Sequence, residues 1–401
     1  MSDSFKSPGD IIHVERRMDL RRLTKTIFRD SLLASQLAKL INDYWRLLRS
    51  NGVEEVKIMN FCGTHEYTST HYGIRNILPQ GVSLVAGPGC PVCITPSYYV
   101  ETAVELALEG FTAYTYGDAY RLPAVREVKG CRSLSDARMA GADVRVVYSF
   151  LDAVRDAASH GKPAVFLAVG FETTCPAYAS AIASEMVPSN LTLISAGRLT
   201  PPAARYAVER VGTVSGVIAP GHVSTITGAG VWRFLPEEYG IPTVVTGFEP
   251  VDVLIAVATI LKQLAENKPG LVVEYSRTVT MDGNQRAKKF LSQVFDVVDS
   301  AWRGIGFIEK SGYSLRKQFE QYDVVKTFGL REPGKDDWKN DLMPGCICGQ
   351  VILGAAKPTD CPLFMKRCTP GTPYGPCMVS AEGACSIWAR LGGRERLVEV
   401  V

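Results

Sequence analysis

The segment Cys346-Ile-Cys348, followed by Cys361-Pro362, Cys368, Cys377 and Cys385, organises the C-terminal part of this chain. It holds six of the eleven cysteines and is unusually rich in proline and glycine. Because so many turn-forming residues cannot build a regular helix or a wide sheet, the segment needs another source of order. Thiolates around a metal would supply it, and so would disulfides.

The spacing of these cysteines favours an iron–sulfur cluster. Zinc ribbons and fingers usually bring their ligands in as C-x2-C knuckles, and the segment contains none. Cys361 is followed by proline, as a ligand cysteine is in bacterial ferredoxins. We therefore predict a [4Fe-4S] cluster, with a zinc or disulfide staple as the alternative. One cluster takes four thiolates, so two of the six cysteines are left for another role.

Composition and charge narrow the classes of function. The chain is 46% hydrophobic, its net charge is only +3, and it has no run of five basic residues, so we expect no nucleic-acid partner. Its first residues lack the apolar core of a signal peptide, and its longest apolar run, Val251 to Leu261, contains Asp252 and is too short for a bilayer. We expect a cytoplasmic protein with no membrane contact, in which cysteines serve metal binding or redox chemistry.

Short apolar segments alternate with helical patterns through most of the chain. The predicted strands are Val56–Phe61, Val82–Ala86, Phe111–Tyr116, Val144–Tyr148, Ala164–Val169, Leu191–Ser195, Gly216–Ala219 and Thr243–Thr246. Helices are predicted at Ala34–Leu48, Val251–Glu266, Gln285–Trp302 and Ser314–Phe319. This alternation predicts an α/β fold with two parallel-sheet domains plus a cysteine-rich iron–sulfur domain.

The predicted domain ranges follow chain order. They are an arginine-rich arm and helix at 1–50, a first α/β domain at 51–150, a second at 151–270, and a helical and [4Fe-4S] cluster domain at 271–401 that a linker at 332–337 divides. The tripeptide Gly-Phe-Glu occurs at 170–172 and at 247–249, each time between a strand and a helix. This recurrence is a weak indication of two similar halves.

The candidate chemical residues follow predicted strands, where ligands bind in open α/β sheets. Cys62-Gly-Thr-His65-Glu66 comes first. Helix N-terminal amides should lower the pKa of Cys62, whereas a lone cysteine can also be a small buried hydrophobe. His65 and Glu66 can ligate a metal, donate protons or orient a ligand.

Three further loops carry candidates. Cys90-Pro-Val-Cys93 has the C-x-x-C spacing of thiol–disulfide oxidoreductases, or forms half of a zinc site. Glu172, followed by two threonines, is either a ligand or an acidic residue at a helix N-terminus. His222, in Pro220-Gly-His-Val-Ser224, is either a site residue or a structural histidine.

Taken together, these motifs resemble the HypD family of [NiFe]-hydrogenase maturation factors. The resemblance spans about residues 35–390 and rests on Cys62-Gly-Thr-His-Glu66, Gly87-Pro-Gly-Cys-Pro-Val-Cys93, Gly170-Phe-Glu-Thr-Thr174, Pro220-Gly-His-Val-Ser224 and the tail from Cys361 to Cys385. It implies a scaffold on which an Fe(CN)2CO unit is assembled together with the small protein HypC. HypE would donate the cyanide, carried as a thiocyanate on its C-terminal cysteine.

The resemblance also implies roles for individual cysteines. By position, the cluster ligands match Cys346, Cys361, Cys368 and Cys385, the iron-binding thiolate matches Cys62, and two redox pairs match Cys348 with Cys377 and Cys90 with Cys93. We expect His65 near the iron bound by Cys62. No phosphate-binding G-x-x-x-x-G-K-[ST] loop is present, so ATP is not included among the expected cofactors, and its involvement stays open on the sequence.

Two other classes of function remain open on the sequence. An iron–sulfur-dependent thiol–disulfide reductase would explain the cluster and the C-x-x-C motif, but it would leave the segment Cys62–Glu66 without a role. A purely structural iron–sulfur or zinc protein could act as an interaction platform.

Overall fold

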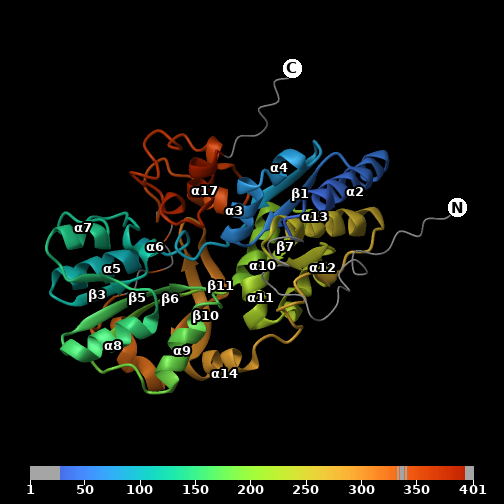
Figure 1. Cartoon of the computed structure of the whole chain (residues 1–401). Coiled ribbons are helices and arrows are strands. Elements are labelled where there is room, and N and C mark those ends of the chain that lie inside the picture. The colour runs from blue at the N-terminus through green and yellow to red at the C-terminus, as the bar shows by residue number, and fades with distance from the viewer. Residues whose placement is uncertain (1–27, 332–333, 335–337, 339–340, 393–401) are drawn as a thin grey trace.

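The computed structural model describes residues 28–331, 334, 338 and 341–392 (Figure 1). The arginine-rich stretch before residue 28 and most of the predicted linker at 332–337 lie outside the described residues.

The first sheet has five parallel strands in the order β2-β1-β7-β8-β9. They are β1 (Val56–Asn60), β2 (Val82–Ala86), β7 (Gly216–Pro220), β8 (Thr243–Thr246) and β9 (Leu271–Val273). The second sheet has four parallel strands in the order β4-β3-β5-β6, namely β3 (Thr112–Thr115), β4 (Val144–Val146), β5 (Ala164–Gly170) and β6 (Leu191–Gly197). All eight predicted strands are therefore present, and the predicted α/β class is confirmed.

The two sheets share one strand order. In each, the second strand along the chain lies outside the first, and the third and fourth extend the sheet on the other side. This order creates a switch point, between β1 and β7 in the first sheet and between β3 and β5 in the second. The recurring Gly-Phe-Glu tripeptide does not occur at equivalent strands of the two sheets. It lies at the end of β5, the third strand of the second sheet along the chain, and after β8, the fourth strand of the first sheet.

Neither sheet coincides with the contiguous ranges predicted for the α/β domains. The range 51–150 contributes β1 and β2 to the first sheet but β3 and β4 to the second. The range 151–270 contributes β5 and β6 to the second sheet and β7 and β8 to the first. The chain thus leaves the first sheet after two strands, builds the second, and returns.

The helix predicted at Gln285–Trp302 is wrong in its second half. Helix α14 (Gln285–Val294) ends where β10 (Phe295–Trp302) begins, and β10 pairs antiparallel with β11 (Gly306–Leu315). The 3₁₀ helix η3 (Lys317–Tyr322) replaces the helix predicted at Ser314–Phe319. The hairpin packs beside β6, where the Leu199 amide donates to the Ser311 carbonyl at 2.8 Å.

Helices cover both faces of the sheets (Figure 1). They are α2 (Ser31–Ser50), α3 (Gly63–His71), α4 (Ile74–Ile77), α5 (Ser97–Leu108), α6 (Gly117–Tyr120), α7 (Leu134–Met139), α8 (Phe150–His160), α9 (Cys175–Ala183), α10 (Thr200–Val211), α11 (Gly221–Thr227), η2 (Ala229–Trp232), α12 (Phe234–Tyr239), α13 (Pro250–Ala265) and α15 (Val324–Thr327).

Helix α2 illustrates why these segments fold as they do. Asp30 caps its N-terminus by accepting from the Leu32 and Leu33 amides, and its buried residues recur at helical spacing. They are Leu37, Ile41, Trp45 and Leu48, which share one hydrophobic core with α13. Within the described residues, no helix is long and apolar enough to cross a membrane.

The C-terminal segment contains little regular structure, as its composition predicts. It forms α16 (Cys348–Ile352), the short 3₁₀ helices η5 (Pro358–Asp360) and η6 (Pro376–Met378), and α17 (Ala384–Leu391). Figure 1 shows it in red, beside α3 of the first sheet and α6 of the second. Its cysteines Cys348, Cys377 and Cys385 share one hydrophobic cluster with Cys90 and Cys93.

Candidate functional site

The switch point of the first sheet brings two candidate residues together. Cys62 lies two residues after the end of β1, and His222 lies in the first turn of α11, after β7. Because β1 and β7 are neighbours and parallel, both residues lie at the same carboxyl edge of the sheet.

Backbone contacts pack two other loops against Cys62. A Cβ atom on Gly89 would lie 2.4 Å from the Cys62 nitrogen, which places the Cys90–Cys93 loop directly beside Cys62. A Cβ atom on Gly63 would lie 2.5 Å from both the Cβ and the carbonyl oxygen of Glu382, in the C-terminal segment. These positions require glycine because only glycine permits such close approach of two backbones.

The expectation of a lowered pKa for Cys62 is not met. Burial, and secondarily the nearby Glu382 carboxylate, raise the pKa of Cys62 to about 11, although hydrogen bonds from Thr64 and His65 lower it. Cys62 stands at the N-cap of α3 as expected, but desolvation outweighs the helix amides. The Cys62 thiol therefore holds its proton at neutral pH.

The rings of His65 and His222 both pack against Phe248, and these three side chains form the cluster around Phe248. The ring centroids of His65 and Phe248 are 4.6 Å apart, and those of His222 and Phe248 are 3.9 Å apart, both in stacked geometry. His65 is fully buried and its Nε2 lies 2.8 Å from the Gly247 carbonyl oxygen. Burial lowers the pKa of His65 to about 4, so the ring is neutral and donates Nε2–H to Gly247. Its Nδ1 has no hydrogen-bond partner among the described residues.

Glu66 serves to join two parts of the chain. Its carboxylate accepts both Arg75 Nη2 contacts at 2.7 and 2.8 Å, the Asn60 amide at 3.1 Å and the Trp388 indole N–H at 2.6 Å. Trp388 belongs to α17, three residues after Cys385. Glu66 therefore ties the Cys62 helix to the C-terminal cysteine segment, and its oxygens are occupied by structural donors.

Cys90 and Cys93 form a disulfide. The pairing needs no zinc, and it is the oxidised state that a C-x-x-C redox pair would adopt. Arg303 N donates to the carbonyl oxygen of Ile94 at 2.9 Å, which holds the end of this loop against the β10–β11 hairpin.

Glu172 lies at the carboxyl edge of the second sheet, after β5. It is fully buried and accepts from Thr200 N at 2.7 Å and from Thr200 Oγ1 at 2.8 Å. Burial raises the pKa of Glu172 to about 7. The hydrogen-bond partner of Glu172 is therefore Thr200, the first residue of α10.

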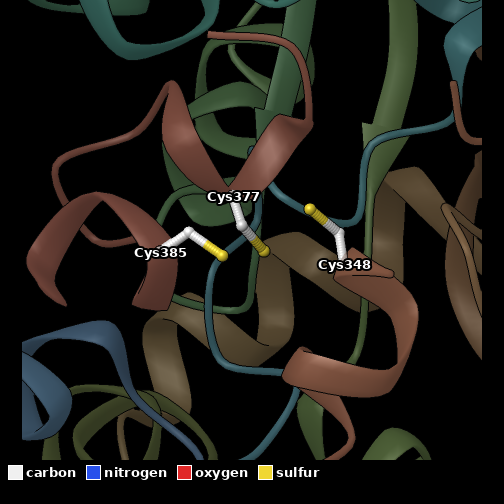
Figure 2. A group of neighbouring side chains, drawn as sticks. All are labelled: Cys348, Cys377 and Cys385. Atoms are coloured by element: carbon white, nitrogen blue, oxygen red, sulfur yellow. The ribbon is translucent and has the colours of Figure 1, made fainter. Parts of the chain in front are cut away.

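The C-terminal cysteines converge on one buried group. The ligand atoms of Cys348, Cys377 and Cys385 all lie within 4.8 Å of one another (Figure 2). The Cys346 Sγ lies 3.2 Å from the Cys348 Sγ, and Cys368 interacts electrostatically with both. The group therefore contains the predicted pair Cys348 and Cys377 together with three of the four predicted cluster ligands. The Cys361 thiol, which is half-buried, makes no hydrogen bond among the described residues.

The donor set suits a metal or cluster. Hydrogen bonding to Cys348 raises the pKa of Cys346, and contacts with Cys348 and Cys385 raise that of Cys377. Contacts with Cys348 and Cys377 lower the pKa of Cys385 to about 6. Several thiols this close cannot all ionise unless a cation balances them, and sulfur-rich sites select zinc or iron–sulfur clusters. Gly375 leaves room for the sulfurs, because its Cβ would lie 2.6 Å from the Cys346 Sγ and 2.8 Å from the Cys348 Sγ.

Two site residues escaped the sequence reasoning. Glu382 stands beside Cys62 although the two are far apart in the chain, and the only local signal was its place in the cysteine segment, next to Gly383. The rings of both histidines stack on Phe248, and the sequence pattern that could have identified Phe248 was the recurring Gly-Phe-Glu tripeptide.

This geometry defines an α/β protein with a thiol at a sheet switch point and a buried cysteine group suited to a metal or cluster. The family model HypD, described as "Hydrogenase formation hypA family", matches residues 33–392. The chain belongs to the HypD family of hydrogenase maturation factors.

Individual relatives agree with the family model. The chain is 40% identical over 339 residues to a putative hydrogenase expression/formation protein of Methanocaldococcus jannaschii, covering 84% of this chain and 92% of that protein. It is 38% identical over 371 residues to the hydrogenase maturation factor HypD of Cupriavidus necator and to HypD2 of Bradyrhizobium diazoefficiens, covering 90% of this chain and 94% of each relative.

Proposed function

We propose that this chain is the scaffold on which an Fe(CN)2CO unit is assembled for [NiFe]-hydrogenase. HypC would share the iron held by Cys62, and HypE would deliver the cyanide. The observation that carries the proposal is the packing of three loops at one place, in a chain of the HypD family: the Cys62 loop, the Cys90–Cys93 loop and the C-terminal cysteine segment.

Cys62 is proposed to hold the iron. Iron that carries cyanide and carbonyl is soft, and thiolate is a fitting ligand for it. The thiol is protonated when free because burial raises the pKa of Cys62 to about 11, so iron binding would release this proton. His65 would orient a bound ligand through Nδ1, since its Nε2–H is committed to Gly247 and its neutral ring has no second proton to give.

The cysteine pairs are proposed to supply electrons. Moving cyanide from a thiocyanate to iron as CN⁻ consumes two electrons and leaves a thiolate, and oxidation of one dithiol to a disulfide supplies two. Cys90 and Cys93 would provide them beside Cys62, and their disulfide is the oxidised product of that step. Cys348 and Cys377 are proposed as the second pair, supported by their proximity. A [4Fe-4S] cluster held by Cys346, Cys361, Cys368 and Cys385 would supply single electrons to this system.

An infrared spectrum tests the scaffold against the alternative, an iron–sulfur-dependent thiol–disulfide reductase, which the Cys90–Cys93 disulfide also suits. Protein purified with HypC should show cyanide and carbonyl bands, and Cys62→Ser should lose them because a hydroxyl is a poor ligand for soft iron. Cys131→Ser is the control, since Cys131 is a buried cysteine outside the site. Bands retained in Cys62→Ser would contradict the scaffold role of Cys62. Bands absent from the wild-type complex would favour the reductase.

A further inference from the structure

The first sheet ends on one side at β2, whose edge differs from the other three sheet edges. Strands β4 and β9 have three residues each, and β6 is covered by β11, since Ser195 Oγ donates to the Tyr313 carbonyl oxygen at 3.1 Å. Strand β2 has five residues and, among the described residues, pairs with β1 alone. Proteins normally shorten, charge or cover such an edge, because its unpaired N–H and C=O groups attract another chain.

The hydrogen bonds of β1 show which groups of β2 face outward. Val56 N–H donates to the Gly81 carbonyl oxygen and Gly87 N–H to the Asn60 carbonyl oxygen, both at 2.7 Å. The odd-numbered residues therefore bond to β1, and the even-numbered residues direct N–H and C=O to the open side. Leu84, at the centre of β2, is 6% exposed, and within the described part of the chain neither of these two groups has a partner. Because buried backbone groups are almost always paired, this edge calls for a partner.

A groove of about 640 Å³ follows this edge. The side chain of Ser83 lines it, and the Ser83 Oγ is buried without a hydrogen-bond partner among the described residues. The other walls come from α3, α4, the turn before β2, and the C-terminal segment through residues 354–357, Trp388 and Gly392. A groove beside an unpaired strand edge is the geometry in which a peptide adds as a further strand, with alternate side chains in the groove.

The chain that follows α17 starts at this groove. Gly392, one of the lining residues, ends α17 in the left-handed conformation, with φ of 67°. Residues 393–401 lie outside the described residues and have the sequence Gly-Arg-Glu-Arg-Leu-Val-Glu-Val-Val. Three valines and one leucine in the last five positions favour a strand and are costly to leave in water. Nine extended residues span about 30 Å and a five-residue strand about 17 Å, so this segment is long enough to follow β2.

The contacts of Trp388 indicate the direction of approach. Its indole donates to Glu66, whose carboxylate also accepts from Asn60, the last residue of β1. Asn60 is the register partner of Ala86, the last residue of β2. Helix α17 therefore contacts the first sheet near the carboxyl end of β2, and a chain that continues from there along β2 runs antiparallel to it. An antiparallel edge strand on an otherwise parallel sheet is common in α/β proteins.

We infer that residues 393–401 bind in this groove as an antiparallel sixth strand of the first sheet and pair with Leu84. Gly392 holds this tail at the groove at an effective concentration of roughly 1 mM, which favours it over a separate peptide of the same affinity. The bound tail ties α17, which carries Cys385, to the first sheet, in addition to the hydrogen bond between Trp388 and Glu66.

Hydrogen–deuterium exchange resolved to single residues tests the contact. The full-length protein is compared with a variant truncated after Gly392. The Leu84 amide should exchange at least about tenfold faster in the truncated protein, because it has lost its partner. The Val85 amide, which faces β1, is the internal reference and should exchange at the same rate in both proteins.

A synthetic peptide of residues 393–401 tests the groove separately. Fluorescence anisotropy of the labelled peptide should show binding to the truncated protein, and at least about tenfold weaker binding to the full-length protein, whose own tail competes. The matched control peptide carries Leu397→Pro and Val398→Pro. Because one of two adjacent strand residues must face β2 and proline has no N–H to donate, this peptide loses the pairing in either register. The same double substitution in the full-length protein should reproduce the effect of truncation on Leu84 with the chain length unchanged.

The outcomes decide between occupants of the groove. Equal exchange of Leu84 in the full-length and truncated proteins would overturn the inference, and so would a peptide that fails to bind the truncated protein or binds equally well with both prolines. Protection of Leu84 that persists after truncation and rises with protein concentration would assign the groove to a second copy of this chain instead. None of these measurements depends on bound iron, so their failure would leave the proposed function untouched.

Discussion

Replacing Glu66 by Gln removes the charge that joins the Cys62 helix to the C-terminal cysteine segment. Gln has the same shape, so the packing around the residue is retained. Arg75 would lose its carboxylate partner, and the Trp388 indole would keep at most a neutral acceptor.

The magnitude follows from burial. The Glu66 side chain is 3% exposed and that of Arg75 is 19% exposed. Breaking a buried ion pair from one side costs about 3–5 kcal/mol. Because the Gln amide oxygen can still accept one of the hydrogen bonds, we expect about 2–4 kcal/mol. A loss of 3 kcal/mol in the local opening free energy of α17 corresponds to a roughly 150-fold faster amide exchange there.

Hydrogen–deuterium exchange of the α17 peptide is the assay, with the α8 peptide as internal reference. Glu238→Gln is the matched control, because Arg205 also contacts both carboxylate oxygens of Glu238, at 2.6 and 2.9 Å, but on the surface. An exposed pair is worth about 0–1 kcal/mol, so this control should leave α17 unchanged. Less than a threefold change in Glu66→Gln, or an equal change in Glu238→Gln, would refute the reasoning.

Three other predictions follow from single contacts. Burial raises the pKa of Glu172 from 4.5 to about 7, so between these pH values the folded state keeps a proton that the unfolded state loses. The free energy of unfolding should therefore fall by up to roughly 3 kcal/mol as the pH rises across this window. Urea unfolding at pH 5 and pH 8 should show this fall in the wild type, and Glu172→Gln should abolish it. Gly63→Ala should destabilise the protein by about 1–3 kcal/mol, since its Cβ would collide with the Glu382 backbone; unchanged unfolding would contradict that contact. His65 should stay neutral above about pH 5 with its proton on Nε2, which ¹⁵N NMR of the imidazole can check; a titration midpoint between 6 and 7 would contradict the assigned burial.

The sequence predicted the strands well because their signal is local. Each of the eight segments is a short, mostly apolar run, seven of them end in a glycine-bearing loop, and each contains a strand in the structure. The helix predicted across Gln285–Trp302 failed because β10 gains its hydrogen bonds from β11. Nothing within residues 295–302 reports that pairing. The contiguous ranges predicted for the two α/β domains do not match the two sheets for the same reason, since the pairing of β1 with β7 joins segments that are far apart in the chain.

The candidate residues show the same division. The sequence by itself identified the chemistry available: Cys62 and His65 after the first strand, a C-x-x-C pair, and a cysteine-rich tail whose composition requires a bound group or crosslinks. Which of these groups ionise and what they contact was decided by the tertiary structure. Glu66 was a candidate ligand on the sequence, yet its carboxylate oxygens accept hydrogen bonds from Arg75 and Trp388.

Cys62 shows why the sequence predicted the position of a reactive group but not its protonation state. Its sequence position placed it correctly at a helix N-terminus, where amides favour a thiolate. Its protonation depends instead on desolvation and on Glu382, and both arise from segments that reach it only when the chain folds. Residue identity and local period therefore determine which groups can react and which segments form strands. Burial and long-range partners determine the state of each group, because water exclusion and electrostatic fields depend on distance in space.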